Sequence, residues 1–357
     1  MDGEHIIVTG AGGFIGSACV REFLARGRRV TALVRGRAGA REVPGRLRGL
    51  AGGGRLTFAS ASITDSEEFL GVLSARVAAM GGRCAALVHC AGRATDVGRD
   101  RLFRAVNLRG VENVSRAVHQ LDIGRLVHMS TTDVYGVRDF TRADESTPRE
   151  NNRRNPYPKY KILAEDAIRA KLPSDRFVLL RPALVWGPGD ETVLPRAVAF
   201  LRSSPAIVHF GRWRGRNVWP LAYVGNVARV AYAAATDDAA RGQAYNVVDP
   251  ERTTMEDYYR LLLSLCLPER GGMRSVTVPF FAAWPVAALS TALSTLLGCK
   301  RPLFDPSLYS LHHVAHSQDF SGEKAGELLA RCGLPWIDRA AAVEQLRTWI
   351  EGGRVPS

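Results

Sequence analysis

The chain has 357 residues, of which 46% are apolar, so it is long enough to bury a large core within one large or two closely joined domains. Its six cysteines are scattered without CxxC or CxxH spacing, which argues against a disulfide framework and a zinc site, and we predict no metal. The N-terminal sequence MDGEHIIVTG lacks the basic and apolar regions of a signal peptide, which favours a cytoplasmic protein.

The net charge of +13 raises the question of nucleic-acid binding. Only five of the 48 basic residues are lysine, and the arginines are spread over the whole chain without a long basic tract. This pattern indicates a compositional bias toward arginine, so we predict no nucleic-acid partner.

The first half of the chain alternates short apolar runs with amphipathic stretches. We predict strands at residues 5–10, 29–35, 55–60, 84–90, 124–131 and 176–182. Between them we predict helices at residues 14–26, 66–80, 100–120 and 157–171. Such repetition predicts an α/β fold of the Rossmann type, with a doubly wound parallel sheet that binds ligands at the carboxyl ends of its strands. The Gly/Arg-rich residues 36–54 are expected to form a mobile surface loop.

After residue 182 the rhythm changes, because helices dominate and only short strands interrupt them, such as those at 219–224 and 244–249. We therefore divide the chain into a Rossmann domain at 1–182, the expected cofactor-binding part, and a smaller, mostly helical substrate-binding portion at 183–357. Some elements of the second portion are expected to return to the first.

Residues 276–299 carry no charge. Their helical part places Ser290, Thr291, Ser294 and Thr295 on one stripe, opposite an apolar face that includes Leu289. A membrane-spanning helix usually lacks such a stripe, so we favour an amphipathic helix at 280–298 that covers the substrate site or touches a lipid surface. Packing in the core remains the alternative.

The sequence VTGAGGFIG follows the first predicted strand and opens the first predicted helix. Its glycines, Gly10, Gly13 and Gly16, allow a tight turn and let a pyrophosphate approach the N–H groups at the start of the helix. This position in the βαβ pattern predicts a dinucleotide site.

The second predicted strand ends in ALVRGR, where an acidic residue would accept hydrogen bonds from the adenosine ribose. Arg35 would instead meet a 2′-phosphate, with Arg37 in support. We therefore favour NADP(H) over NAD(H).

The sequence YPKYK at 157–161 holds two tyrosines and two lysines. Only Tyr157 and Lys161 stand four residues apart, so they share one helix face. A nearby ammonium is expected to lower the pKa of the Tyr157 phenol toward a value useful for proton exchange. Lys159 and Tyr160 are expected to point toward the surface or an interface.

Three hydroxyl residues, Ser130, Thr131 and Thr132, follow the fifth predicted strand. A hydroxyl at this edge can donate to a substrate oxygen that gains negative charge. Thr131 suits this task best, and the other two are read as caps of the strand end.

Taken in order, these motifs resemble the extended short-chain dehydrogenase/reductases of the NAD-dependent epimerase/dehydratase family. The resemblance runs from residue 5 to about 250, through TGAGGFIG, VHCAG, NLRG, MSTTDVYG, YPKYKILAE, LRPALVWGPGD and YVGNVA. It implies that Thr131, Tyr157 and Lys161 are catalytic, with Asn107 in a supporting position. It also implies cofactor contacts from Gly10, Gly13, Phe14, Ile15, Gly16, Ile63, Cys90, Ala91, Gly92, Asn107, Tyr157, Lys161, Pro182 and Val185.

The chain departs from the family pattern at Ser62, where an acidic residue is usual, and at Tyr160, where a small residue is usual. The nucleotide-sugar enzymes of the family carry an asparagine at the position of Leu184 and a phosphate-binding arginine at the position of Trp219. The dehydratases carry Asp-Glu where this chain has Thr132 and Asp133.

The last third of the chain instead resembles the 3β-hydroxysteroid dehydrogenase-like branch. We expect Thr132, Asp133, Leu184 and Trp219 to contact the substrate. The predicted function is NADP(H)-dependent interconversion of a secondary alcohol and a ketone on a largely apolar substrate, in a homodimer. The alternatives are a nucleotide-sugar 4-epimerase or 4-ketoreductase and a redox-inactive NADP sensor.

Overall fold

The computed structural model describes residues 4–35, 45–50, 53–152, 154–299 and 301–353. Arg37 and most of the loop predicted at 36–54 lie outside the described residues. The described part of that loop includes one short 3₁₀ turn, η1 (Gly45–Leu47).

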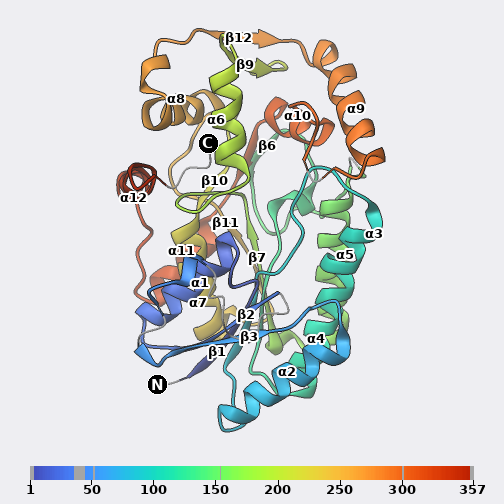
Figure 1. Cartoon of the computed structure of the whole chain (residues 1–357), viewed down its shortest axis with the longest axis vertical. Coiled ribbons are helices and arrows are strands. Elements are labelled where there is room, and N and C mark those ends of the chain that lie inside the picture. Colours follow the sequence, from blue (N-terminus) through green and yellow to red (C-terminus); the bar gives the residue numbers. More distant parts are fainter. Residues whose placement is uncertain (1–3, 36–44, 51–52, 153, 300, 354–357) are drawn as a thin grey trace.

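A seven-stranded parallel sheet forms the centre of the protein, with the strand order β11-β7-β5-β4-β1-β2-β3 (Figure 1). The strands are β1 (His5–Thr9), β2 (Arg29–Val34), β3 (Leu56–Ser60), β4 (Ala86–His89), β5 (Leu126–Met129), β7 (Phe177–Pro182) and β11 (Ala244–Val247). The six strands predicted for the first half are confirmed. Their apolar runs are buried on both faces, as parallel sheets require.

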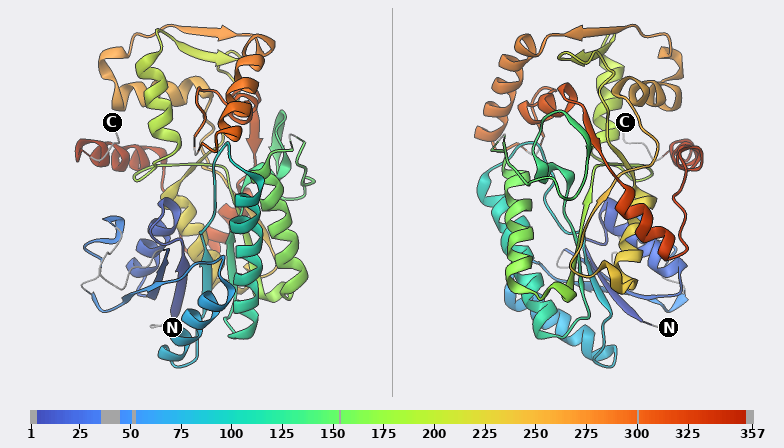
Figure 2. Two further views of the ribbon diagram at one scale, coloured as in Figure 1. Left: turned by 45° about the vertical axis from the view of Figure 1, so that its right-hand side comes forward. Right: turned by 180° about the vertical axis from the view of Figure 1, so that it is seen from behind.

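Helices cover both faces of this sheet (Figure 2). One layer holds α1 (Phe14–Ala25), α7 (Val224–Thr236) and α11 (Glu323–Arg331), which share one hydrophobic core with the sheet. The other layer holds α2 (Ser66–Ala79), α4 (Gly110–Gln120) and α5 (Pro156–Lys171). This arrangement confirms the predicted doubly wound Rossmann fold.

The helix predicted at 100–120 is helical throughout but not uniformly α. It consists of α3 (Asp100–Phe103), a π-helical turn η3 (Arg104–Arg109) and then α4. Such π turns are frequent at functional sites, and this one carries Asn107.

The chain after residue 182 builds a second part above the carboxyl edge of the sheet (Figure 1). Its helices are α6 (Val193–Ser203), α8 (Met255–Cys266), α9 (Phe280–Leu296), α10 (Leu308–Ala315) and α12 (Arg339–Glu351). Three two-stranded sheets pair β8 (Leu184–Trp186) with β10 (Leu221–Tyr223), β9 (Ile207–Phe210) with β12 (Ser275–Val278), and β6 (Phe140–Ala143) with β13 (Gln318–Phe320). The same stretch of chain also supplies β11, α7 and α11 to the Rossmann layers, so the division at residue 182 stays a prediction.

Helix α9 is amphipathic, as predicted, but its polar stripe faces inward except for Thr295, which is exposed. Ser290 and Ser294 are fully buried, whereas Leu289, Leu296 and Leu297 are exposed. The alternative that the apolar face of this helix packs in the core is therefore wrong. None of the described helices combines the length and the hydropathy needed to cross a membrane.

Candidate active site

A cavity of about 500 Å³ lies at the carboxyl edge of the sheet, where the two parts of the chain meet. Its wall contains most of the residues predicted for the site: Gly10, Gly13, Phe14, Ile15, Gly16, Cys90, Gly92, Thr131, Thr132, Asp133, Tyr157, Pro182, Leu184, Val185 and Trp219. Five predicted residues, Arg35, Ile63, Ala91, Asn107 and Lys161, are not part of this wall.

The glycine turn between β1 and α1 fits a dinucleotide. Gly10 has φ +64°, and a Cβ atom there would lie 2.7 Å from the backbone N of Ala91. A Cβ on Gly16 would lie 2.2 Å from the carbonyl oxygen of Gly10. Helix α1 starts without a side-chain cap and without an acidic residue in its first turn. Its free N–H groups can therefore face a pyrophosphate.

Arg35 lies directly after β2 and is exposed. No carboxylate among the described residues pairs with it, so its guanidinium is available to a phosphate. Ile63 packs under Gly110, where a Cβ atom would lie 2.7 Å from the Ile63 Cδ1 atom. Ile63 is buried there, in the core between the sheet and the helices that cover it.

Tyr157 and Lys161 lie one turn apart on the inner face of α5. Lys161 is buried, and its Nζ atom donates a hydrogen bond of 2.7 Å to the carbonyl oxygen of Met129 at the end of β5. The same Nζ atom lies 6.0 Å from the centre of the Tyr157 ring. The backbone N–H of Asp133 donates to the Oγ1 atom of Thr131 at 3.2 Å, so the threonine side chain is held at the cavity wall.

The expected effect of Lys161 on Tyr157 is wrong in this structure. Burial raises the pKa of the Tyr157 phenol, the negative charge of Asp133 raises it further, and only a hydrogen bond with Thr131 lowers it. Lys161 donates its hydrogen bond to the Met129 carbonyl, and no hydrogen bond joins it to the Tyr157 hydroxyl among the described residues. The phenol is consequently held in its protonated form at neutral pH.

The second tyrosine–lysine pair has a structural partner. The Tyr160 hydroxyl donates to Oδ2 of Asp100, and Nζ of Lys159 lies 3.2 Å from Oδ1 of the same carboxylate. Both contacts tie α5 to α3. The prediction that this pair points toward the surface holds for Lys159, whereas it is wrong for Tyr160, which is buried.

Asn107 supports the loop after β4. Its Oδ1 atom accepts a hydrogen bond from the backbone N of Arg93 at 2.7 Å, and its Nδ2 atom donates to the Arg93 carbonyl at 2.9 Å. A Cβ atom on Gly92 would lie 3.5 Å from Nζ of Lys161 and 3.6 Å from Oδ1 of Asn107. Asn107 thus fixes the backbone against which Lys161 rests.

A buried charged network beneath the site holds α5 against the sheet. Oε1 of Glu165 accepts from Oγ of Ser130 at 2.6 Å and from Nε of Arg181 at 2.9 Å, and its Oε2 accepts from Nη2 of Arg181 at 2.6 Å. Hydrogen bonds and the charge of Arg181 lower the pKa of Glu165 although burial acts in the opposite direction. Ser130 therefore does more than cap a strand end.

Sequence reasoning missed Tyr309 and His313, which α10 places on the cavity wall. The Tyr309 hydroxyl donates to Oδ2 of Asp133, and Nε2 of His313 lies 3.9 Å from its Oδ1. The rings of Tyr309 and His313 are 4.5 Å apart. Their i, i+4 spacing was the one available signal, since it places both side chains on one helix face.

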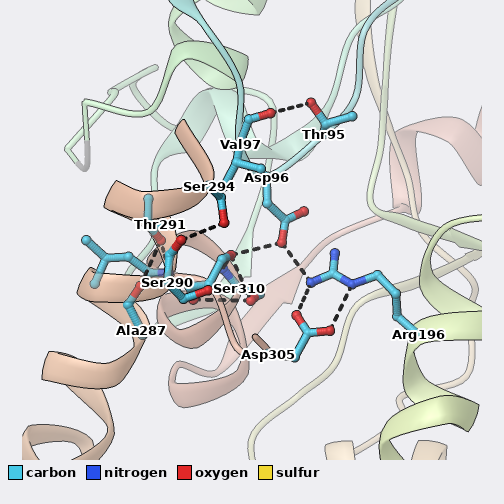
Figure 3. Close-up of polar contacts among 12 residues, drawn as sticks. Thr95, Asp96, Val97, Arg196, Ala287, Ser290, Thr291, Ser294, Asp305 and Ser310 are labelled. Carbon is cyan, nitrogen blue, oxygen red and sulfur yellow. Dashed lines mark hydrogen bonds and ion pairs between the residues drawn. The ribbon is translucent and has the colours of Figure 1, made fainter. Parts of the chain in front are cut away.

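Three charged residues of the cavity wall were also missed. Arg196 of α6 lies between the carboxylates of Asp96, at 3.0 Å, and Asp305 (Figure 3). The guanidinium is thus shared by two acids. Nothing in the spacing of these residues signals their meeting, because they come from three distant segments.

Apolar side chains make up much of the remaining wall. Leu184 and Trp219 stand on it, together with Phe200, Tyr258 and Tyr259. The indole N–H of Trp219 and the hydroxyl of Tyr258 are buried without a partner among the described residues.

Comparison with known proteins decides the family. Residues 6–247 match the NAD dependent epimerase/dehydratase family, which is more than half of the chain. The chain belongs to this family. It is an NAD(P)-dependent oxidoreductase of the extended short-chain dehydrogenase/reductase type.

Three characterised relatives show which branch the chain resembles. It is 29% identical to a 2-alkyl-3-oxoalkanoate reductase of Shewanella oneidensis, over 90% of this chain and 81% of the relative. It is 28% identical to a 4-hydroxy-2-methyl-3-oxo-4-farnesyl-3,4-dihydroquinoline-1-oxide ketoreductase of Stigmatella aurantiaca, over 95% and 97%. A 3 beta-hydroxysteroid dehydrogenase/Delta 5-->4-isomerase of Mycobacterium tuberculosis is 29% identical over 73% and 69%. The predicted likeness to the 3β-hydroxysteroid dehydrogenase-like branch is confirmed.

Solved structures confirm the fold. The UDP-glucuronic acid 4-epimerase of Bacillus cereus, in complex with UDP-glucuronic acid and NAD, superposes with a TM-score of 0.69. The superposition covers 98% of this chain and 99% of the epimerase, with 19% sequence identity. At this identity the likeness concerns the fold alone.

Proposed function

We propose that the protein uses NADP(H) to interconvert a ketone and a secondary alcohol on a largely apolar substrate. One observation carries the proposal: Tyr157 and Thr131 stand on the wall of the same cavity as the glycine turn and the apolar residues around Trp219. A cofactor on the glycine turn and an apolar substrate would therefore meet beside the two hydroxyl groups.

The bound nicotinamide supplies or accepts the hydride. In the reductive direction, the Tyr157 hydroxyl donates its proton to the carbonyl oxygen, and the Thr131 hydroxyl donates a hydrogen bond to the same oxygen. The Tyr157 phenol is protonated at neutral pH, which is the form that donates in the reductive direction, although its raised pKa makes it a weaker acid than an ordinary phenol. Lys161 would turn from the Met129 carbonyl to hold the cofactor ribose, and Asn107 positions the loop at its side.

Arg35 supports NADP(H) over NAD(H). It stands after β2, where a ribose-binding carboxylate would be needed for NAD(H), and it has no carboxylate partner among the described residues. A 2′-phosphate would complete its hydrogen bonds.

The wall of the cavity supports an apolar, uncharged substrate. Leu184 and Trp219 bring no positive charge to hold a diphosphate, and Arg196 is already shared by two carboxylates. The unpartnered donors of Trp219 and Tyr258 would suit an acceptor at the far end of the substrate. Steroid-like, polyketide-like and long acyl ketones have this combination, with Thr132 and Asp133 beside the reacting end.

The test offers the enzyme a panel of steroid, polyketide and acyl ketones. Oxidation of NADPH and, in separate reactions, of NADH is monitored by absorbance. Calorimetric titration of the NADP-loaded enzyme with UDP and dTDP runs beside it. We expect turnover of at least one apolar ketone with NADPH and no nucleotide binding. Micromolar binding of UDP or dTDP without any ketone turnover would restore the nucleotide-sugar alternative, and binding of NADP without any redox reaction would favour a sensor.

We also propose a cytoplasmic homodimer. The exposed side chains of Leu102 on α3 and Leu163 on α5, two helices in contact, support a second copy at this face. Sedimentation measures the oligomeric state of the wild type and of Leu163→Asp. A monomeric wild type would contradict the proposal.

A further inference from the structure

The outer face of α9 and its flanks form the largest group of exposed apolar side chains in the described chain. Phe281 is 79% exposed, Leu296 76% and Leu297 66%. The other members of this outer apolar face are Val276, Trp284, Val286, Leu289, Leu303 and Phe304. Elsewhere only Leu102 and Leu163 are large, apolar and exposed among the described residues. A patch of this kind marks a binding surface.

Hydrogen bonds from the inner stripe of α9 fix this orientation (Figure 3). Oγ of Ser290 donates to the Phe304 carbonyl at 2.7 Å, and Oγ of Ser294 accepts from the backbone N of Leu303 at 2.9 Å. Oγ1 of Thr291 accepts from the backbone N of Leu308 at 2.7 Å. The stripe satisfies the peptide groups of the segment at 303–308. Turning the apolar face inward would leave these groups unpartnered, so the patch is part of the folded state.

The charges that border the outer apolar face are mainly basic, and nearby acids such as Asp305 and Glu191 pair with other arginines. Between Arg270 and Asp305 the sequence contains no acidic residue, and its charged residues are Arg274, Lys300 and Arg301. Arg274 and Arg301 are exposed and pair with no carboxylate among the described residues. Arg99 adds a further exposed guanidinium, whose Nη2 atom would lie 3.6 Å from a Cβ atom on Gly298. Exposed aromatic and leucine side chains bordered by arginine fit an anionic lipid surface.

The same segment reaches the active-site cavity. Asp305 pairs with Arg196, and Oγ of Ser307 donates to Oδ2 of Asp96 at 2.9 Å. Asp96, Arg196 and Asp305 line the cavity. The outer apolar face and the wall of the cavity are therefore two sides of one hydrogen-bonded unit.

We propose that the outer apolar face of α9 lies on the surface of a bilayer that contains anionic lipids. A second copy of the chain fits this face less well. A twofold contact would bring Arg274 and Arg301 of both copies together, while the nearby acids Asp305 and Glu191 are already paired within each chain. The proposal goes beyond the redox reaction and does not depend on it, although an apolar substrate dissolved in the bilayer would lie close to the cavity.

The experiment is flotation of the purified full chain with vesicles of phosphatidylcholine alone and with phosphatidylglycerol added. We expect the wild type to float with the anionic vesicles only. Phe281→Ser combined with Leu296→Ser and Leu297→Ser should reduce the bound fraction at least about tenfold, because three large side chains no longer enter the interface. Arg274→Ser and Arg301→Ser should each weaken binding about fivefold, and only on anionic vesicles.

Leu163→Ser is the matched control, because it removes an exposed leucine of α5, which is not part of the outer apolar face, and it should bind like the wild type. Unchanged far-ultraviolet circular dichroism and NADP binding of the triple variant would show that it is folded. Wild-type protein that stays unbound, or a triple variant that floats as well as the wild type, overturns the proposal. So does a triple variant that merely dissociates a dimer, since the face would then bind a second copy. Failure of the ketone panel leaves this result untouched.

Discussion

Lys161 should make the cofactor-free protein less stable at neutral pH than at alkaline pH. Its ammonium is buried and donates a hydrogen bond to the neutral carbonyl of Met129. Burial lowers the pKa of Lys161 from 10.5 to about 8, while the charges of Cys90 and Glu165 raise it only partly. The native lysine therefore holds its proton more weakly than the unfolded lysine does.

The sign and size of the effect follow from this difference. Between the two pKa values the unfolded state binds more protons, so the free energy of unfolding rises with pH in that window. Each pKa unit corresponds to about 1.4 kcal/mol, which makes the buried ammonium cost about 3 kcal/mol at pH 7. Roughly 2 kcal/mol of this cost disappears between pH 7 and about pH 9.5.

Urea unfolding of the wild type and of Lys161→Met, without cofactor and at both pH values, measures the effect. The methionine also leaves the Met129 carbonyl unpartnered, at a cost of about 1–3 kcal/mol at either pH. The diagnostic quantity is therefore the change with pH: the wild type should gain about 2 kcal/mol relative to the variant. Lys159→Met is the control, because the Asp100 carboxylate raises the pKa of Lys159, and no such gain is expected. A difference between wild type and Lys161→Met that stays constant with pH would refute the reasoning.

Three further predictions concern activity. Tyr157→Phe should lower turnover by about 10²–10⁴-fold with cofactor affinity unchanged. Tyr160→Phe should keep turnover within a few fold and lower the free energy of unfolding by about 1–3 kcal/mol, as measured by urea unfolding. Steady-state kinetics in which both variants lose turnover equally would contradict this prediction. Arg35→Asp should weaken NADPH binding about 10–100-fold and improve NADH binding, as measured by cofactor fluorescence. If the wild type binds both cofactors with equal affinity, Arg35 does not select NADPH and the prediction fails. Asp305→Asn should free Arg196 for a substrate carboxylate and raise kcat/KM for a 3-oxo acid about tenfold relative to its methyl ester. If this ratio is the same in the variant and the wild type, Arg196 does not bind the substrate carboxylate.

The sheet and the glycine turn could be predicted because local sequence determines them. Each strand of the first half is a short apolar run that parallel neighbours bury on both faces. Gly10 and Gly16 lie where any side chain would meet the backbone of the turn, so the requirement for glycine is visible in the sequence. The spacing of Tyr157 and Lys161 likewise follows from one helical turn.

The charged part of the cavity wall could not be predicted because long-range packing assembles it. Asp96, Arg196 and Asp305 meet from three segments, and no periodicity relates them. In α9 the helical period shows two opposite faces but not which of them is buried. The choice depends on the peptide groups of 303–308, which need the serine stripe as partner.

Helix α5 explains why one short stretch holds two tyrosine–lysine pairs with different tasks. Tyr157, Lys161 and Glu165 recur every four residues on its inner face, and Glu165 is bound to Ser130 and Arg181 from two neighbouring strands. This charged contact fixes the position of the helix along the sheet, and with it the depth at which the two preceding side chains enter the site. Lys159 and Tyr160 bind Asp100 of α3 and so fix the rotation of α5 about its axis. A shift of even one residue would remove Tyr157 from Thr131, so the geometry of the proposed site depends on contacts made outside the cavity.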